Sequence, residues 1–230
     1  MYALLTSTPS AGTLKWALNT TAPIAAAAAF SQDMNTLYFQ SDLLYALDVK
    51  DGRILWSLQI SYFSPWMPPL VGPDHTIYAA SGQPSFQGIA AVYGTGPNTG
   101  KVKFTLPISS GGTALDADGM LYTIDMSTTS LEAYYTYGPY AGKMDWSYNY
   151  GSSAASTSPI IVNSTLIVGT WNNALLGICT QESCASQHLW SLQLPSGASS
   201  HLFSAGIASA DGSFMLVGSL DYSVYCIALT

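Results

Sequence analysis

The chain has 230 residues and a formal net charge of −7, and only 8% of its residues are charged while 48% are hydrophobic. The six Lys and Arg residues form no basic stripe, which argues against nucleic acid as a partner. No run approaches the roughly 18 consecutive apolar residues that a membrane-spanning helix needs. The scarcity of charge is more typical of an exported protein than of a cytosolic one. We therefore expect an extracellular or periplasmic location, with a leader that is not present in this sequence.

A short motif recurs along the chain, in which an aromatic residue follows a glycine by four positions. The aromatic residues advance by 40, 48, 42 and 44 residues from one copy to the next. Glycine permits the positive φ of a tight turn, and the aromatic ring can pack between neighbouring sheets. The copies are GTLKW (12–16), GRILW (52–56), GKVKF (100–104), GKMDW (142–146) and the degenerate SQHLW (186–190).

Three further types of apolar segment accompany the motif, and each occurs five times. The first type is rich in small residues and lies at 23–30, 68–72, 112–117, 158–163 and 204–210. The second type lies at 36–40, 76–80, 120–124, 165–169 and 215–219. The third type lies at 43–48, 88–93, 131–135, 174–179 and 224–229. Turn signals separate the segments and none has a helical period, so each repeat is predicted to form four strands, a to d, with the motif at strand d.

Four short antiparallel strands repeated every forty-odd residues predict an all-β fold, a β-propeller of four-stranded antiparallel blades. Because strands a to c occur five times, we expect five blades in a single domain that spans 1–230. The repeats are expected at roughly 20–60, 61–108, 109–150, 151–195, and 196–230 together with 1–19.

The fifth repeat ends after its strand c, and the strand at 14–19 is expected to supply strand d and to close the ring. Residues 1–5, MYALL, then look like an extra strand c without a blade. The segment from Met1 to Ser7 is either the remnant of a longer propeller or an arm that pairs with a neighbouring molecule, which would make the protein a homo-oligomer. All six basic residues lie in or beside the c–d hairpins, where cationic side chains discourage pairing between exposed edges.

The best-preserved copy carries a family resemblance. Tyr45-Ala46-Leu47-Asp48, followed by Asp51-Gly52 and Trp56, resembles the YALD-x-x-TG-x-x-x-W pattern of the PQQ-type (quinoprotein-like) propeller repeat. The resemblance implies the propeller fold. That family includes dehydrogenases that hold pyrroloquinoline quinone over calcium or a lanthanide, and also non-enzymatic scaffolds. The dehydrogenases carry a vicinal cysteine pair and a set of metal-binding acids, and no such motif occurs in this chain, so no cofactor and no metal site are predicted.

Propellers usually bind their ligands through the b–c and d–a loops, and here those loops are rich in aromatic residues and amides. Such side chains suit a sugar ring or the surface of a partner protein. Some of the rings could instead pack between blades. The candidate ligand-binding residues are Tyr62, Trp66, Phe86, Trp171, Asn172, His201 and Tyr222.

Several other residues suggest modification or structural roles. Cys179 and Cys184 flank a polar turn and could close a disulfide in an oxidising compartment, whereas Cys226 lies in an apolar strand and is expected to be buried. Asn19 and Asn163 head sequons that are possible glycosylation sites. The acids at 116–118 fit an a–b hairpin turn better than a calcium loop, because no Glu stands at the twelfth position.

The sequence leaves three functions open. The first is a non-enzymatic binding or assembly scaffold that recognises a protein or a glycan through one propeller face. The second is a quinoprotein-type oxidoreductase, or a degenerate relative of one, which would need the quinone and calcium. The third is a self-assembling structural subunit of a filament or coat.

Overall fold

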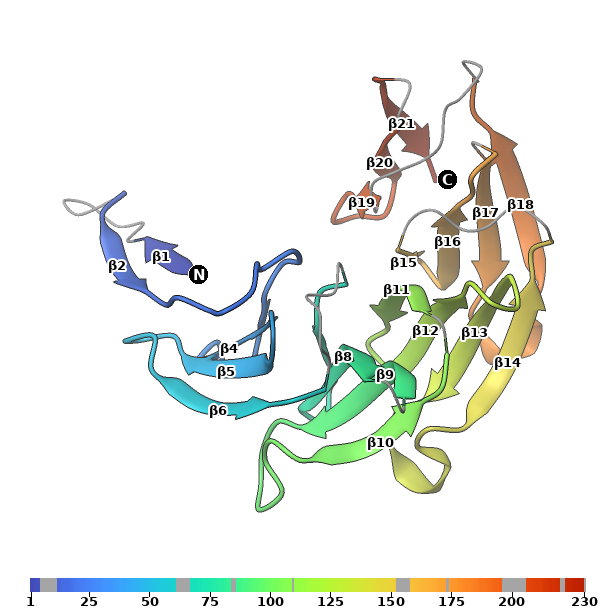
Figure 1. The fold of residues 1–230 in the computed structure, drawn as a ribbon. Coiled ribbons are helices and arrows are strands. Elements are labelled where there is room, and N and C mark those ends of the chain that lie inside the picture. The colour runs from blue at the N-terminus through green and yellow to red at the C-terminus, as the bar shows by residue number, and fades with distance from the viewer. Residues whose placement is uncertain are drawn as a thin grey trace. The chain divides into compact units, whose positions relative to one another are not determined.

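The computed structural model describes residues 1–4, 12–60, 67–83, 86–108, 110–151, 158–172, 174–195, 206–219 and 222–229. The chain divides into two compact units, Met1–Pro107 and Ile108–Thr230. Strands dominate both units (Figure 1). The described residues contain two single 3₁₀ turns, Gly138–Tyr140 and Glu182–Cys184, and none of their helices could span a membrane.

The first unit contains one two-stranded and two four-stranded antiparallel sheets. The two-stranded sheet pairs β1 (Tyr2–Leu4) with β2 (Leu14–Ala17). The next sheet has the order β3 (Ala29–Phe30), β4 (Thr36–Gln40), β5 (Leu44–Asp48) and β6 (Ile54–Leu58). The third has the order β7 (Leu70–Val71), β8 (Thr76–Gln83), β9 (Phe86–Tyr93) and β10 (Val102–Leu106).

The second unit contains two four-stranded sheets and a three-stranded one. The first sheet has β11 (Ser110–Leu115), β12 (Met120–Asp125), β13 (Ser130–Tyr135) and β14 (Met144–Asn149). The second has β15 (Ile160–Val162), β16 (Thr165–Gly169), β17 (Ala174–Cys179) and β18 (His188–Gln193). The third has β19 (Ile207–Ala208), β20 (Phe214–Gly218) and β21 (Val224–Ala228). In every four-stranded sheet each strand pairs with the next along the chain, which confirms a propeller built from antiparallel blades.

Neighbouring sheets within each unit share an apolar core. In the first unit, Tyr38, Leu44 and Ala46 pack with Ile77, Ala79, Ala90 and Val92 of the following sheet. In the second unit, Tyr122, Ile124, Leu131 and Ala133 pack with Leu166, Val168 and Ile178. Leu166, Val168 and Ile178 belong to the sheet β15–β18, which is the middle sheet of the second unit. Its opposite face contributes Val162, Ile167 and Leu175 to a core with Met215, Val217 and Ile227. Strands b and c of a middle blade therefore bury both of their faces, which explains their continuous apolar runs.

The N-terminal strands pair differently from our expectation. We expected 14–19 to pair with the fifth sheet as its strand d, but β2 pairs with β1, and the sheet β19–β21 has three strands among the described residues. Leu18 N also donates to Met1 O at 2.9 Å. The reason is that β1 and β2 form a complete c–d hairpin of their own, so β1 already occupies the position beside β2. The part of the proposed arm at 1–4 consequently pairs within its own chain, and 5–7 lie outside the described residues.

Candidate functional site

The three sheets of the second unit have their a–b turns at the same end. The a–b turn 116–119 and the loop 180–185 line one pocket together with Ser164 in the next a–b turn. The Asn163 side chain of that turn lies against Gly212 in the a–b turn of the last sheet, with Nδ2 2.6 Å from the position that a Cβ would take. The a–b turns of all three sheets are therefore neighbours. It follows that the three b–c turns lie together at the opposite end of the unit.

Each of these b–c turns presents a large, exposed, largely apolar side chain. Met126 follows β12 and is 46% exposed, Trp171 follows β16 and is 48% exposed, and Tyr222 precedes β21 and is fully exposed. We call these three side chains and their turns the b–c surface. We take these side chains as a candidate binding surface, because apolar side chains gathered at one end of a domain can mark an interaction site. Trp171 and Tyr222 were predicted from the sequence, and Met126 was not.

The structure gives Asn172 a role in shaping its turn. Its side-chain Oδ1 accepts a hydrogen bond from the Thr170 hydroxyl, and its backbone O accepts one from Gln193 Nε2 at 2.8 Å. Thr170 Oγ1 in turn accepts a hydrogen bond from Ala174 N at 3.2 Å. These bonds fix the turn that carries Trp171, and fixing an anchor before binding lowers the entropy that binding costs.

Of the other predicted ligand residues, the structure describes only the backbone of Phe86. Phe86 begins β9 in the first unit, where its Cα partner is Gln83. Tyr62, Trp66 and His201 lie outside the described residues. Their proposed roles stay predictions.

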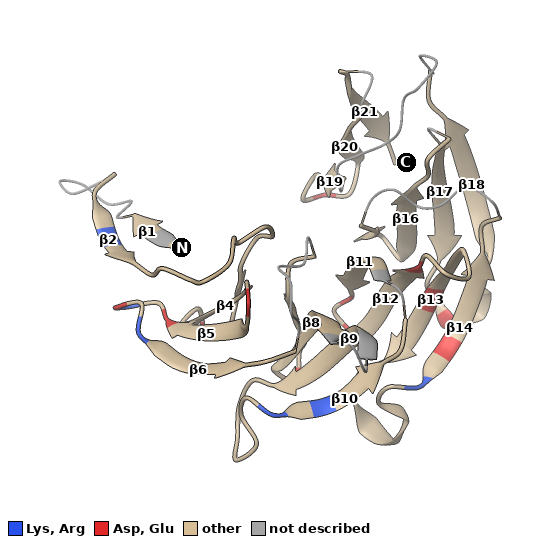
Figure 2. Ribbon diagram, viewed as in Figure 1, with Lys and Arg blue, Asp and Glu red and all other residues tan. Residues whose placement is uncertain are grey.

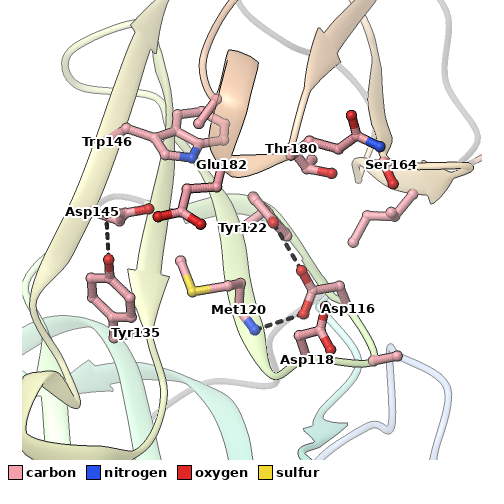
Figure 3. Close-up of a pocket in the computed structure, with 14 residues that line it drawn as sticks. Asp116, Asp118, Met120, Tyr122, Tyr135, Asp145, Trp146, Ser164, Thr180 and Glu182 are labelled. Carbon is pink, nitrogen blue, oxygen red and sulfur yellow. Dashed lines mark hydrogen bonds between the residues drawn. The ribbon is translucent and has the colours of Figure 1, made fainter.

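An acidic pocket of about 870 Å³ lies at the other end of the second unit. Figure 3 shows Asp116 and Asp118 in the a–b turn on one side, and Asp145 on β14 with Glu182 in the loop 180–185 on the other. None of its 14 lining residues is Lys, Arg or His. The sequence did not predict this pocket, because its acids come from a turn, a strand and a loop that are far apart in the sequence.

Two tyrosines tie the pocket acids into the sheets. Tyr122 Oη donates to Asp116 Oδ2 at 2.9 Å, and Met120 N donates to Asp116 Oδ1 at 2.7 Å. Burial, reinforced by the hydrogen bond to Asp116, raises the pKa of the Tyr122 hydroxyl above its ordinary value. Tyr135 Oη donates to Asp145 Oδ1 at 2.7 Å, and that hydrogen bond raises the pKa of Tyr135. Both hydroxyls stay protonated at neutral pH. With four acidic residues and no basic one, the pocket suits a cationic group.

The donor groups do not fit a calcium-bound quinone. Across the part of the chain that the structure describes, no three His, Cys, Asp or Glu residues are placed to hold a metal ion. The two nearest cysteines are Cys179 and Cys184, which are five positions apart and not adjacent.

Cys179 and Cys184 form a disulfide across the c–d loop that follows β17, with their Cα atoms 5.8 Å apart. Cys226 is a free thiol and is exposed, so the expectation that it is buried is wrong. It lies on β21, where its neighbour Ile227 on the opposite face of the strand is buried. The two sequon residues Asn19 and Asn163 are both exposed, and their glycosylation stays a prediction.

Comparison with known proteins supports the fold. No family model and no curated protein matches the chain. The chain is similar to the crystal structure of BamB from Moraxella catarrhalis, with a TM-score of 0.70 and 17% sequence identity over 95% of this chain. The match covers 62% of the BamB chain, so this chain spans less than two thirds of that protein's length.

Proposed function

We propose that the protein is a non-enzymatic, extracytoplasmic binding scaffold built from PQQ-type propeller repeats, and that it recognises a partner protein through the b–c surface. The observation that carries this proposal is the exposed side chain on each of three successive b–c turns, Met126, Trp171 and Tyr222. Trp and Tyr are the side chains most often found as energetic anchors of protein interfaces. The fold likeness to BamB is compatible with a scaffold role for this chain.

The residue types on the b–c surface favour a protein partner over a glycan. Aromatic planes suit either, but the flexible, unbranched side chain of Met126 is typical of surfaces that adapt to apolar protein side chains. Truncating one such anchor to Ala typically costs about 2 kcal/mol of binding free energy or more.

Two observations support an extracytoplasmic location. The disulfide between Cys179 and Cys184 requires an oxidising compartment to persist. The scarcity of charged residues, 8% of the chain, is consistent with the same compartment.

The experiment that tests the proposed function is selection of peptides from a phage-displayed library on the purified chain. Peptides selected on the wild type are expected to bind the double variant Trp171→Ala/Tyr222→Ala at least about 30-fold more weakly, because the loss of even one anchor costs about 2 kcal/mol. Affinities are measured by calorimetry.

The matched control is Tyr137→Ala/Tyr140→Ala. These two rings are 51% and 57% exposed but lie in the c–d connection before β14, away from the b–c turns. Selected peptides are expected to bind this control as they bind the wild type. Equal loss of affinity in both double variants, or no loss in either, contradicts a b–c binding surface. If the chain selects no peptides but binds glycans on an array, the proposal of a protein partner is contradicted.

A further inference from the structure

The loop that the disulfide closes has the same backbone framework as the c–d turns of two other sheets, β7–β10 and β11–β14. In each turn, the residue that ends strand c donates its N–H to the carbonyl eight positions later and accepts from the N–H seven positions later. A third bond joins the N–H of the eighth residue after it to the carbonyl of the fifth. All these bonds are 2.8–3.1 Å long, and the residues that end strand c are Tyr93, Tyr135 and Cys179. The three turns are therefore copies of one another.

One position of this framework has a left-handed backbone, and of the three turns only the one with the disulfide fills it without glycine. The seventh residue after the end of strand c is Gly100 with φ +76°, Gly142 with φ +80° or Ser186 with φ +63°. A residue with a Cβ is strained in this conformation, because the Cβ approaches the following carbonyl oxygen. The turn at 179–187 thus carries a backbone strain that the other two avoid.

The disulfide joins the first and the sixth residue of this strained turn, Cys179 and Cys184. The equivalent residues of the sheet β11–β14 are Tyr135 and Tyr140, whose ring centroids are 5.7 Å apart. The turn that keeps its glycine therefore has a side-chain contact at this pair of positions. The turn that has lost its glycine has a covalent bond there, which restricts the conformations that an opened loop could adopt.

The closed loop forms one wall of the acidic pocket. Thr180, Gln181, Glu182 and Ala185 line the pocket, and Figure 3 shows the Glu182 side chain directed toward Asp145 on β14. No lining residue is basic, so no side chain of the pocket offsets the repulsion between these two carboxylates. The repulsion and the strain of the turn both favour an open loop, and the disulfide opposes them.

We propose that the disulfide is a redox switch, which holds this strained turn closed and with it the wall of the acidic pocket. A dithiol reductant opens the switch in two exchanges. One thiolate of the dithiol attacks Sγ of Cys184, which is half-buried, and the more deeply buried Cys179 leaves as a thiolate. The second thiolate of the dithiol then closes its own disulfide and releases Cys184. Two electrons pass from the dithiol to the cysteines, which end as two thiols, and the 3₁₀ turn that carries Glu182 is free to leave the pocket.

Amide hydrogen exchange, followed residue by residue by NMR, tests the switch on the whole chain. Because the chain has three cysteines and one is free, dithiothreitol has a single disulfide to reduce. Reduction is expected to lower the protection factors of the Cys184, Ser186 and Gln187 amides at least about tenfold, since their hydrogen bonds belong to the released loop. The amides of Gly142 and Lys143 make the equivalent bonds in a turn without a disulfide, and they are expected to keep their protection.

Ser186→Gly tests whether the missing glycine is what makes the turn depend on the disulfide. With glycine in place, reduction is expected to leave the protection of the turn nearly unchanged. Ser183→Gly is the matched control, in the same loop but without a left-handed φ, and it is expected to show the full loss on reduction. This inference does not depend on the b–c surface.

Three results would overturn the proposal. Unchanged protection at 184–187 on reduction means that the turn holds without the disulfide. An equal loss at 142–143 means that the disulfide stabilises the whole unit and not this wall of the pocket. A full loss in reduced Ser186→Gly means that the strain of the turn does not drive the opening.

Discussion

At the residue scale, the glycine of the repeated motif adopts the positive φ of a tight turn and also leaves room for a neighbouring aromatic ring. Gly52 has φ +75°, and a Cβ there would lie 2.6 Å from Cδ2 of Trp16, the aromatic residue of the preceding copy. Gly100 has φ +76°, and its Cβ would lie 3.3 Å from Cδ2 of Trp56. The sequence predicted the turn and an aromatic residue between sheets. That Trp16 and Trp56 each cover the glycine of the next copy depends on how one blade is aligned with the next, which no local pattern encodes.

Comparing Gly52→Ala with Gly96→Ala separates the cost of the left-handed backbone from the cost of displacing the ring. Gly96 has φ +82° but nothing within 4 Å of a Cβ. Gly96→Ala is expected to cost about 1 kcal/mol in the free energy of unfolding, from the left-handed backbone alone. Gly52→Ala should cost about 1–3 kcal/mol more, because Trp16 must move from the position where its Nε1 donates to Val49 O at 3.0 Å. Urea unfolding measures both, and equal losses would contradict the packing role.

At the scale of the element, the a–b hairpins depend on carboxylates that accept several hydrogen bonds. Asp33 accepts from Ser31 Oγ at 2.6 Å and from Asn35 N at 3.1 Å. Asp211 accepts from Ser209 Oγ at 2.6 Å and from Ser213 N at 3.1 Å. The hydrogen bonds from Ser31 and Ser209, followed by the others, lower the pKa of both carboxyls from 3.8 to about 2.

These lowered pKa values predict a pH dependence of stability. A carboxyl with a lower pKa in the folded state stabilises it above pH 4, and that stabilisation is lost as the pH falls from about 4 to about 2. Asp33→Asn is therefore expected to be less stable than the wild type at pH 7, with the difference shrinking over this range. Asp51→Asn, in a c–d turn, serves as the control. Urea unfolding midpoints of the wild type and the variants are measured across the pH range, and NMR follows the titration of the Asp33 carboxyl. A stability difference between the wild type and Asp33→Asn that does not depend on pH would contradict this role of Asp33.

The sequence predicted the types of element better than their extents. The b, c and d strands of the four-stranded sheets lie close to the predicted ranges. In contrast, strand a of the first repeat, expected at 23–30, is the two-residue β3, because a run of alanines has low strand propensity. The pairing of β2 with β1 was missed because we assigned the strand at 14–19 to the incomplete fifth repeat, which left the strand c recognised at 1–5 without a blade.

At the scale of the whole molecule, part of the b–c surface could be predicted and the rest could not. Trp171 and Tyr222 stand out in polar loops, and aromatic residues there point to recognition. Met126 follows a buried strand in an ordinary-looking turn, and only the alignment of successive blades brings it to the same end as the other two. The acidic pocket depends on the same alignment, since Asp116, Asp145 and Glu182 come from different blades or turns.

Hydrogen–deuterium exchange on the chain with and without a phage-selected peptide tests the central claim most directly. The peptide is expected to slow amide exchange in the three b–c turns of the second unit, at 126–129, 170–172 and 222–223, because contact with Met126, Trp171 and Tyr222 buries these turns. Exchange in the a–b turn 116–119 and the loop 180–185 should stay unchanged. Slower exchange at 116–119 and 180–185, with no change in the b–c turns, would place recognition at the acidic pocket and contradict the proposed binding surface.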